Sequence, residues 1–186
     1  MKFIDGYISY VESKLVNLNL PSQPVNLYEP ITYFLKLGGK RIRPVLTLLS
    51  TELFGGKKEY ALNAAIAVEL FHNFTLIHDD IMDESSLRRG KKTVQEKWDN
   101  NIAILSGDVL FVNSYKFLQK QKASDLSDLF FSFNSMAEKL CEGQQMDMDF
   151  EKCQVVDQES YLEMIKFKTS VLLGCALEMG AIIAEA

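Results

Sequence analysis

The sequence predicts an all-α fold, and three observations support this prediction. Apolar residues recur at three- and four-residue steps along most of the chain, which is the period of a helix with one buried face. No segment keeps the apolar–polar alternation of a half-buried strand over more than a few residues. Glycine and proline breakers are concentrated in the first third. A chain of 186 residues with 47% hydrophobic residues can bury one core, so we expect a single domain over residues 1–186.

Three helices are predicted in the first third of the chain, each ended by a helix breaker. They cover residues 3–18, 28–37 and 44–54. The second helix stops at Gly38 and Gly39, because glycine readily takes the left-handed conformation found after helix ends. Pro44 suits the first turn of the third helix and favours an extended conformation at Arg43. The loop between these two helices therefore carries basic residues next to a helix start.

The next predicted helix is long and apolar, covers residues 60–83 and has acidic residues at its far end. A polar loop follows over residues 85–92, and Thr93 and Glu96 have the spacing of a capping box that opens another helix. The further predicted helices cover residues 101–121, 126–150 and 159–186. The last of them runs to the end of the sequence without a cap or a stop signal.

The composition excludes several classes of protein. The formal net charge of -5 gives no overall attraction to nucleic acid or to an anionic membrane, so we expect neither partner. No uncharged stretch has the roughly 18 apolar residues of a membrane span, and no signal peptide is predicted. The three cysteines have neither disulfide-framework nor metal-site spacing, which favours a reducing cytoplasm. Any bound anion must therefore meet local basic clusters.

Three carboxylates at the end of the long helix form a candidate metal site. Asp79 and Asp83 project within about 40° of each other on a helix, and Asp80 lies within about 100° of Asp79. Like charges this close need a counter-charge, and carboxylate oxygens are ligands that Mg²⁺ prefers. Because Mg²⁺ completes its shell with water and substrate phosphates, the group indicates a phosphorylated ligand. The alternative interpretation is a solvated acidic helix end.

Two basic clusters flank these carboxylates in the sequence. Lys40 and Arg43 lie in a glycine-rich loop just before a helix start, where free N–H groups favour an anion. Arg88 and Arg89 follow the acids, and guanidinium groups bind phosphates with paired donors. Each cluster alone is compatible with an exposed charged loop. Two of them around a carboxylate helix favour a site for a Mg²⁺-bound diphosphate.

Together these motifs resemble the trans-isoprenyl diphosphate synthases, also called polyprenyl synthetases. The resemblance rests, in chain order, on Gly38-Gly39-Lys40-Arg41-Ile42-Arg43-Pro44, His72, His78-Asp79-Asp80-Ile81-Met82-Asp83, Arg88-Arg89-Gly90, Gly143-Gln144-x-x-Asp147 and Lys168-Thr169. It extends over essentially the whole chain. It implies an all-α, isoprenoid synthase-type helical bundle around a central cavity. It also implies Mg²⁺-dependent condensation of isopentenyl diphosphate with an allylic diphosphate, namely the dimethylallyl, geranyl or farnesyl compound.

The resemblance further implies roles for individual residues. Asp79 and Asp83 would ligate Mg²⁺, with Asp80 as a further ligand or a neighbour of the ligands. The isopentenyl diphosphate would be held by Lys40, Arg43, His72 and Arg89. The allylic diphosphate would be held by Arg88 and Lys168, with Gln144 and Thr169 near the reacting groups. Without the family position, a lone histidine in an apolar stretch such as His72 is more often a core residue.

Product length is expected to depend on Phe74 and Thr75. They precede Asp79 by five and four residues, about one helical turn deeper, and a turn of about 5.4 Å is comparable to one isoprene unit. An aromatic residue at this position with a small neighbour resembles the pattern of the family's short-chain synthases, which make the C15 or C20 product. The alternative is that Phe74 is ordinary core packing.

The sequence departs from the family pattern after Thr169. Family members carry a second aspartate-rich motif on a later helix, whereas the only acids here are Glu178 and Glu185. We therefore expect a bundle that lacks its C-terminal helices, and a chain that is weakly active or inactive by itself. The resemblance also implies a homodimer.

Two other interpretations stay open on the sequence alone. His78-Asp79 with His72 is compatible with an HD-type helical metallophosphohydrolase, although such sites need more histidines than the two in this chain. The missing second motif is compatible with a non-catalytic partner or an inactive fragment of a synthase.

Overall fold

A computed structural model describes residues 2–121 and 126–186, and it confirms the all-α prediction. The described chain forms two compact units. Unit 1 comprises Met1–Val45 and Leu62–Lys120, and unit 2 comprises Leu46–Ala61 and Gln121–Ala186. The prediction of a single domain over residues 1–186 stays a prediction.

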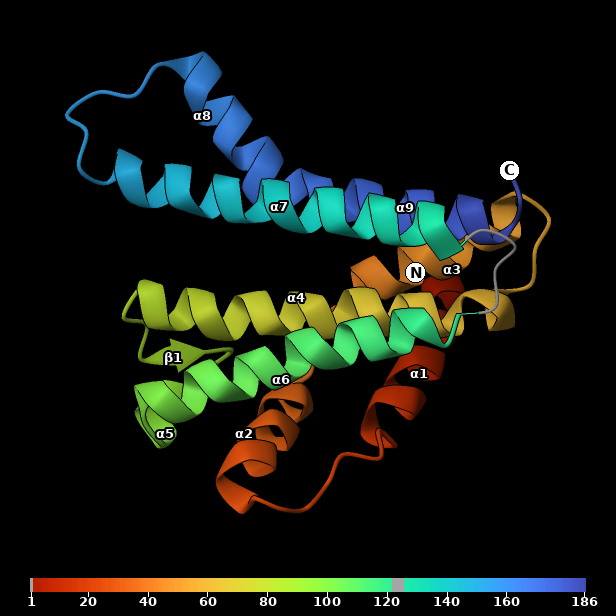
Figure 1. Cartoon of the computed structure of the whole chain (residues 1–186), viewed down its shortest axis with the longest axis horizontal. Coiled ribbons are helices and arrows are strands. Elements are labelled where there is room, and N and C mark those ends of the chain that lie inside the picture. Colours follow the sequence, from red (N-terminus) through yellow and green to blue (C-terminus); the bar gives the residue numbers. More distant parts are fainter. Residues whose placement is uncertain (1, 122–125) are drawn as a thin grey trace. The chain divides into compact units, whose positions relative to one another are not determined.

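Unit 1 is built around two long helices that lie side by side and run in opposite directions (Figure 1). Its elements are α1 (Lys2–Val16), α2 (Val25–Lys36), α4 (Leu62–Met82), β1 (Leu87–Arg88), β2 (Lys91–Lys92), α5 (Val94–Lys97) and α6 (Asn100–Gln119). Helix α4 packs along α6, while α2 also packs on α6 and α1 on α4. The core of the unit therefore lies along α4.

The sequence of α4 explains its central position. Its residues from Ala64 to Phe71 are all buried, so the helix is apolar around its circumference rather than along one stripe. Helix α6 has four small residues among its buried ones. These are Ala103, Ser106, Gly107 and Ser114. The small residues allow α4 and α6 to approach closely, which fixes the direction in which the acidic end of α4 points.

Unit 2 contains a second set of packed helices. Its elements are the larger part of α3 (Ile42–Leu53), the 3-10 turn η1 (Lys58–Ala61), α7 (Leu126–Phe150), α8 (Gln158–Ile165), the π-helical turn η2 (Lys166–Ser170) and α9 (Val171–Ile183). Figure 1 shows α7 and α9 side by side, with α8 diverging from α7. The hydroxyls of Ser50 and Thr51 donate to the carbonyl oxygens of Leu177 and Gly180. These bonds tie α3 to α9.

The structure corrects three of the predicted elements. Residues 85–92 are not all loop, because Leu87–Arg88 pairs with Lys91–Lys92 as a short antiparallel hairpin. Thr93 precedes α5, but its side chain makes no capping bond and instead donates to the carbonyl oxygen of Ser85 at 2.7 Å. The predicted helix over 159–186 is divided by the π-helical turn, and its last segment ends at Ile183. The helix predicted over 126–150 is confirmed.

One described helix, Lys58–Met82, is long and apolar enough to cross a membrane by length and composition alone. Of its apolar window, 61% is buried inside the protein. Core helices of folded domains pass the same test, so the match is weak evidence for a membrane span.

Candidate active site

The acidic end of α4 carries the predicted metal ligands. The amide of Asp83 donates to the carbonyl oxygen of Asp79 at 2.9 Å, so the helical spacing of the two residues holds to the end of the motif. The side chain of Asp79 is 22% exposed, whereas that of Asp80 is 1% exposed. Asp79, which is partly exposed, and Asp83, which is exposed, are thus available to a ligand, while Asp80 is buried.

Arg88 supplies the counter-charge to these acids. Its Nε and Nη2 each lie 2.7 Å from Asp80 Oδ1, and Nη2 lies 3.6 Å from Asp79 Oδ2. Burial raises the pKa of Asp80, and Arg88 opposes this shift. The other oxygen, Asp80 Oδ2, is buried and accepts no hydrogen bond. Arg88, predicted to hold the allylic diphosphate, lies directly beside the predicted metal ligands.

The carboxylates at the end of α4 have the type of donor atom that a hard cation such as Mg²⁺ prefers. They offer oxygen donors, and Asp80 Oδ2 is an acceptor for which the described residues supply no donor. Within residues 2–121 and 126–186, no group of three or more His, Cys, Asp or Glu side chains is arranged as a complete metal site. Asp79 and Asp83 would therefore hold Mg²⁺ with water and substrate oxygens completing its shell.

A second site lies about two turns earlier on α4, around His72. Arg43 Nη1 lies 3.1 Å from His72 Nε2. Burial, followed by the positive charges of Arg43 and Arg89, lowers the pKa of His72 to about 3. His72 is therefore neutral at pH 7. Because a guanidinium only donates, Nε2 is the acceptor and the ring proton is on Nδ1.

The third component of this site is Arg89, which reaches the glycine-rich loop. A Cβ at Gly39 would lie 3.0 to 3.2 Å from the guanidinium atoms of Arg89, so the loop backbone runs directly against that group. Burial lowers the pKa of Arg89, and the charge of Arg41 adds to the shift. Lys40 is exposed in the same loop. Unit 1 thus brings together Arg43, His72 and Arg89, three of the four residues predicted to hold isopentenyl diphosphate.

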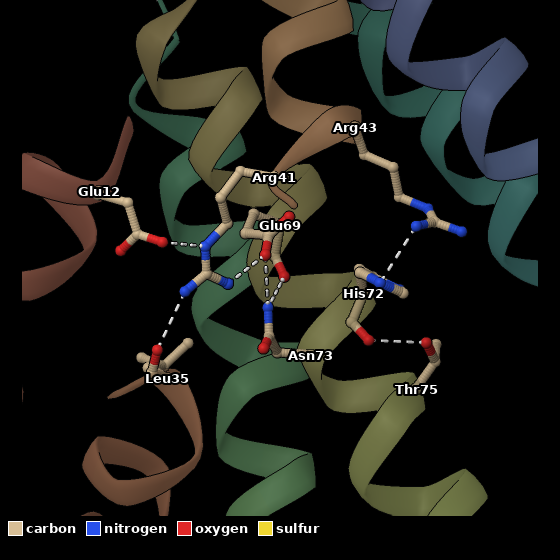
Figure 2. A network of polar contacts seen from close by, with 8 residues as sticks. All are labelled: Glu12, Leu35, Arg41, Arg43, Glu69, His72, Asn73 and Thr75. Carbon is tan, nitrogen blue, oxygen red and sulfur yellow. Dashed lines mark hydrogen bonds and ion pairs between the residues drawn. The ribbon is translucent and has the colours of Figure 1, made fainter. Parts of the chain in front are cut away.

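Arg41 lies in the same loop but faces away from His72. Its guanidinium donates to the carboxylates of Glu12 on α1 and Glu69 on α4, and to the carbonyl oxygen of Leu35 (Figure 2). Asn73 donates to the same Glu69 oxygen at 3.0 Å. The side chain of Arg41 is 0% exposed and that of Glu69 is 3% exposed. This set, Glu12, Arg41, Glu69 and Asn73, is called the Arg41 network below.

Phe74, the predicted product-length residue, belongs to an aromatic cluster. Its ring centroid lies 5.5 Å from Phe71, 4.7 Å from His78 and 5.1 Å from Phe111 of α6. Thr75 donates its hydroxyl to the carbonyl oxygen of His72 at 2.8 Å, so it contacts its own helix. Phe74, Thr75 and Phe111 are all partly buried.

Unit 2 carries the later predicted residues. Lys168 Nζ and Asp147 Oδ2 form an ion pair at 2.5 Å. A Cβ at Gly143 would lie 2.3 Å from the amide nitrogen of Lys168, so glycine is required where α7 meets the π-helical turn. The Gln144 amide nitrogen is buried without a hydrogen-bond partner, and Thr169 is exposed. Such π-helical turns occur often at functional sites.

His78 does not join the carboxylates. Its ring lies against α6, where Nε2 is 3.2 Å from the carbonyl oxygen of Ile104. A Cβ at Gly107 would lie 2.4 Å from the ring, so this glycine makes room for the histidine. A His-Asp metal pair needs both side chains to converge, and here they diverge. The HD-type phosphohydrolase interpretation is therefore not supported.

Sequence reasoning missed several residues that shape the site. Arg41 belonged to a recognised basic cluster, but its partners Glu12 and Glu69 lie 29 and 28 residues away in the chain. A buried glutamate in an apolar helix was the available signal for Glu69. Gly107 and Phe111 are on α6, where only their three- and four-residue spacing marks a buried face.

The helical fold, the acidic end of α4 and the arginines beside it agree with the family that the sequence resembles. The family model for polyprenyl synthetases matches residues 24–186, and the chain belongs to this family. The chain is 42% identical over 176 residues to a geranylgeranyl pyrophosphate synthase of Geoglobus acetivorans. The aligned region covers 93% of this chain and 55% of that protein. It is 41% identical over 180 residues to a geranylgeranyl diphosphate synthase of Methanosarcina mazei, covering 96% of this chain and 56% of that protein.

A solved structure gives the same result. The geranylgeranyl pyrophosphate synthetase of the archaeon Geoglobus acetivorans superposes with a TM-score of 0.94 at 41% sequence identity. The match covers 97% of this chain and 60% of that chain. The chain thus spans little more than half the length of the relatives that it matches.

Proposed function

We propose that the protein containing this chain is a Mg²⁺-dependent prenyltransferase of isoprenoid biosynthesis. It condenses isopentenyl diphosphate with an allylic diphosphate, releases diphosphate and forms an all-trans prenyl diphosphate of 15 to 20 carbons. Family membership and the names of the two geranylgeranyl diphosphate synthases support this proposal.

The observation that carries the proposal is the arrangement of charge along α4. Cationic groups surround neutral His72, and three carboxylates with one arginine follow about two to three turns later. One substrate diphosphate would bind at the cationic site and the other at the carboxylates through Mg²⁺. Two adjacent anion sites of different composition suit a reaction that joins two different diphosphate esters.

Each residue has a role in this proposal. Arg43, Arg89, His72 and Lys40 bind the diphosphate of isopentenyl diphosphate, with His72 uncharged and its Nε2 accepting from Arg43. Arg88, Lys168, Gln144 and Thr169 act on the allylic substrate. When bound at Asp79 and Asp83, Mg²⁺ supplies positive charge that stabilises the departing diphosphate. Fixed guanidinium groups stabilise the same developing charge without reorganising.

Product length depends in this proposal on the aromatic cluster at Phe74. Its contacts with Phe71 and Phe111 hold the ring in place, as a floor for the growing chain requires. Geranylgeranyl diphosphate, the C20 compound named for both relatives, is the product that we favour.

We also propose a homodimer in a reducing cytoplasm. Helix α6 exposes the apolar side chains of Ile104 and Val112 at 40% and 50%, and their eight-residue separation puts them on one face. Cys141 and Cys153 are exposed as free thiols, as a reducing compartment permits. Sedimentation equilibrium of the wild type and of Ile104→Glu tests the dimer; identical masses for both would contradict the role of this face.

The test of activity uses the full-length protein with labelled isopentenyl diphosphate and each of the three allylic primers, with Mg²⁺ or with EDTA. We expect Mg²⁺-dependent incorporation and a main C20 product on chain-length analysis. No incorporation with any primer, or hydrolysis of nucleotides instead, would overturn the proposal.

A further inference from the structure

The backbone at Arg41 is in an unusual conformation for a residue with a side chain. Arg41 has a φ of 48°, following Gly38 at 77° and Gly39 at 158°. The left-handed region is unfavourable for residues with a Cβ, and the surrounding contacts must hold Arg41 there. The loop conformation therefore depends on what the Arg41 side chain contacts.

Those contacts come from three different helices. Arg41 Nε lies 2.6 Å from Glu12 of α1, Nη1 lies 2.5 Å from Glu69 of α4, and Nη2 lies 3.0 Å from the carbonyl oxygen of Leu35 in α2. Burial lowers the pKa of Arg41, but Glu69 and Glu12 outweigh it and hold the pKa above the ordinary value. One buried cation is thus matched by two carboxylates and one helix-terminal carbonyl.

Arg41 and Arg43 contact α4 at two points one turn apart. Arg41 pairs with Glu69, and Arg43 pairs with His72 three residues later, on the same side of the helix (Figure 2). The backbone between the two arginines is therefore fixed at both ends. Lys40 precedes Arg41 directly, and Gly39 lies against Arg89.

From this geometry we infer that Arg41 is a positioning residue for the isopentenyl diphosphate site. It binds no substrate itself. Its three bonds hold the segment of residues 38–43 against α1, α2 and α4, so that Lys40, Arg43 and Arg89 are arranged before the diphosphate arrives. This inference rests on the proposed function, because it assigns the substrate of the cationic site.

A residue that only stabilises the fold would behave differently from a positioning residue. Loss of a purely structural contact lowers the fraction of folded enzyme, and therefore kcat, but leaves the KM of the folded molecules unchanged. Loss of positioning raises KM for the substrate whose groups are displaced. The two substrates of the reaction provide an internal control, because the allylic diphosphate uses other residues.

The test compares Arg41→Lys, Glu12→Gln and Arg43→Gln in the full-length protein, at a temperature where each variant is folded by circular dichroism. Lysine keeps the charge but cannot make the three directed bonds. We expect Arg41→Lys to raise KM for isopentenyl diphosphate about tenfold, and KM for the allylic substrate less than about twofold. Glu12→Gln removes the negative charge of one partner at the edge of the network. It should give a smaller rise in KM for isopentenyl diphosphate. This milder variant serves if Arg41→Lys does not fold.

A double-mutant cycle gives the sharper readout. If Arg41 acts through Arg43, then Arg41→Lys should have little further effect on KM in the Arg43→Gln background. Glu29→Gln, an exposed acid on α2, is the matched control and should change neither KM.

The outcomes separate the two proposals. Unchanged KM values in Arg41→Lys and Glu12→Gln, with lowered melting temperatures only, would overturn the positioning role while the proposed function stands. Equal rises in both KM values would also overturn it. If Arg43→Gln has no effect on isopentenyl diphosphate, the proposed function of the cationic site fails, and the inference fails with it.

Discussion

Helix α4 carries two carboxylate–arginine groups, and they differ in how completely their charges are matched. In the Arg41 network, one guanidinium with no exposed side-chain surface is shared by carboxylates from α1 and α4. At the end of α4, Arg88 has a 24% exposed side chain and faces several acids of one helix, one of which has an unpaired buried oxygen. We call the first group closed, because Arg41 and Glu69 are buried and Glu12 alone of the two carboxylates reaches solvent. We call the second group open, because Arg88 and Asp79 are both partly exposed. Burial and charge balance thus distinguish a scaffold pair from a reactive one on the same helix.

The strongest test of this contrast is Asp79→Ala in the open group. We expect turnover to fall by about a thousandfold or more, because the metal ligand is lost. The free energy of unfolding should change by less than about 1 kcal/mol, since a partly exposed ion pair contributes little. Steady-state kinetics and urea unfolding give the two numbers. A large loss of stability with modest loss of turnover would reverse the assignment of the two groups.

The complementary change in the closed group is Glu69→Gln. It removes a buried charge that accepts from Arg41 and Asn73, so we expect a loss of about 2–3 kcal/mol in the free energy of unfolding. Urea unfolding measures it, with Glu29→Gln as the exposed control. If Glu69→Gln were as stable as the control, the Arg41 network would not be a scaffold.

His72 lies between the two groups and gives a prediction on pH. Its pKa is about 3 in the folded protein, below the ordinary value of 6.5. The unfolded chain therefore takes up a proton that the folded chain does not. Folded stability should fall as the pH falls from about 6.5 toward 3, by about 2 kcal/mol between pH 7.5 and pH 5. The His72→Gln variant should lose this dependence when urea unfolding is repeated at both pH values; an unchanged slope would contradict a buried neutral histidine.

The smallest expected effect concerns Phe74, which is also on α4 between the two groups. Phe74→Ala removes a ring from the aromatic cluster and opens a space of about one isoprene unit. We expect the main product to lengthen by about one unit with turnover within a few-fold of the wild type. Chain-length analysis of the labelled product measures it, with Tyr115→Phe as a control, because the Tyr115 ring lies 5.1 Å from Phe111 at the edge of the cluster. An unchanged product distribution would leave Phe74 as core packing.

The sequence was sufficient for the elements that depend on local pattern. The periodicity over residues 126–150 predicted α7 with its observed ends, and Gly38 and Gly39 marked the end of α2 within a residue or two. Two-residue strands such as Leu87–Arg88 are too short to show a period, so the hairpin was missed. Thr93 was misassigned because its hydroxyl bonds to a distant carbonyl rather than to its own helix.

The site shows the same division between local and tertiary information. The types of residue at Asp79, His72 and Arg43 could be recognised from their spacing and family pattern. The difference between Arg41 and Arg43 could not, because both are arginines of one short basic segment. Their contacts differ only because folding brings Glu69 to one and His72 to the other.

The hairpin turn at Arg89 and Gly90, between Arg88 and Lys91, has a consequence for insertions and deletions in this segment. Arg89 and Gly90 both have positive φ values, 53° and 74°, as a two-residue type I′ turn requires. The turn sends adjacent guanidinium groups to different destinations, one to Asp80 and the other to the Gly39 backbone. Lengthening the turn by a single residue would shift the pairing of Leu87 with Lys92 and misdirect both arginines at once. The length of this small turn therefore sets the spacing between two guanidinium groups, one at the carboxylates of α4 and one at the glycine-rich loop.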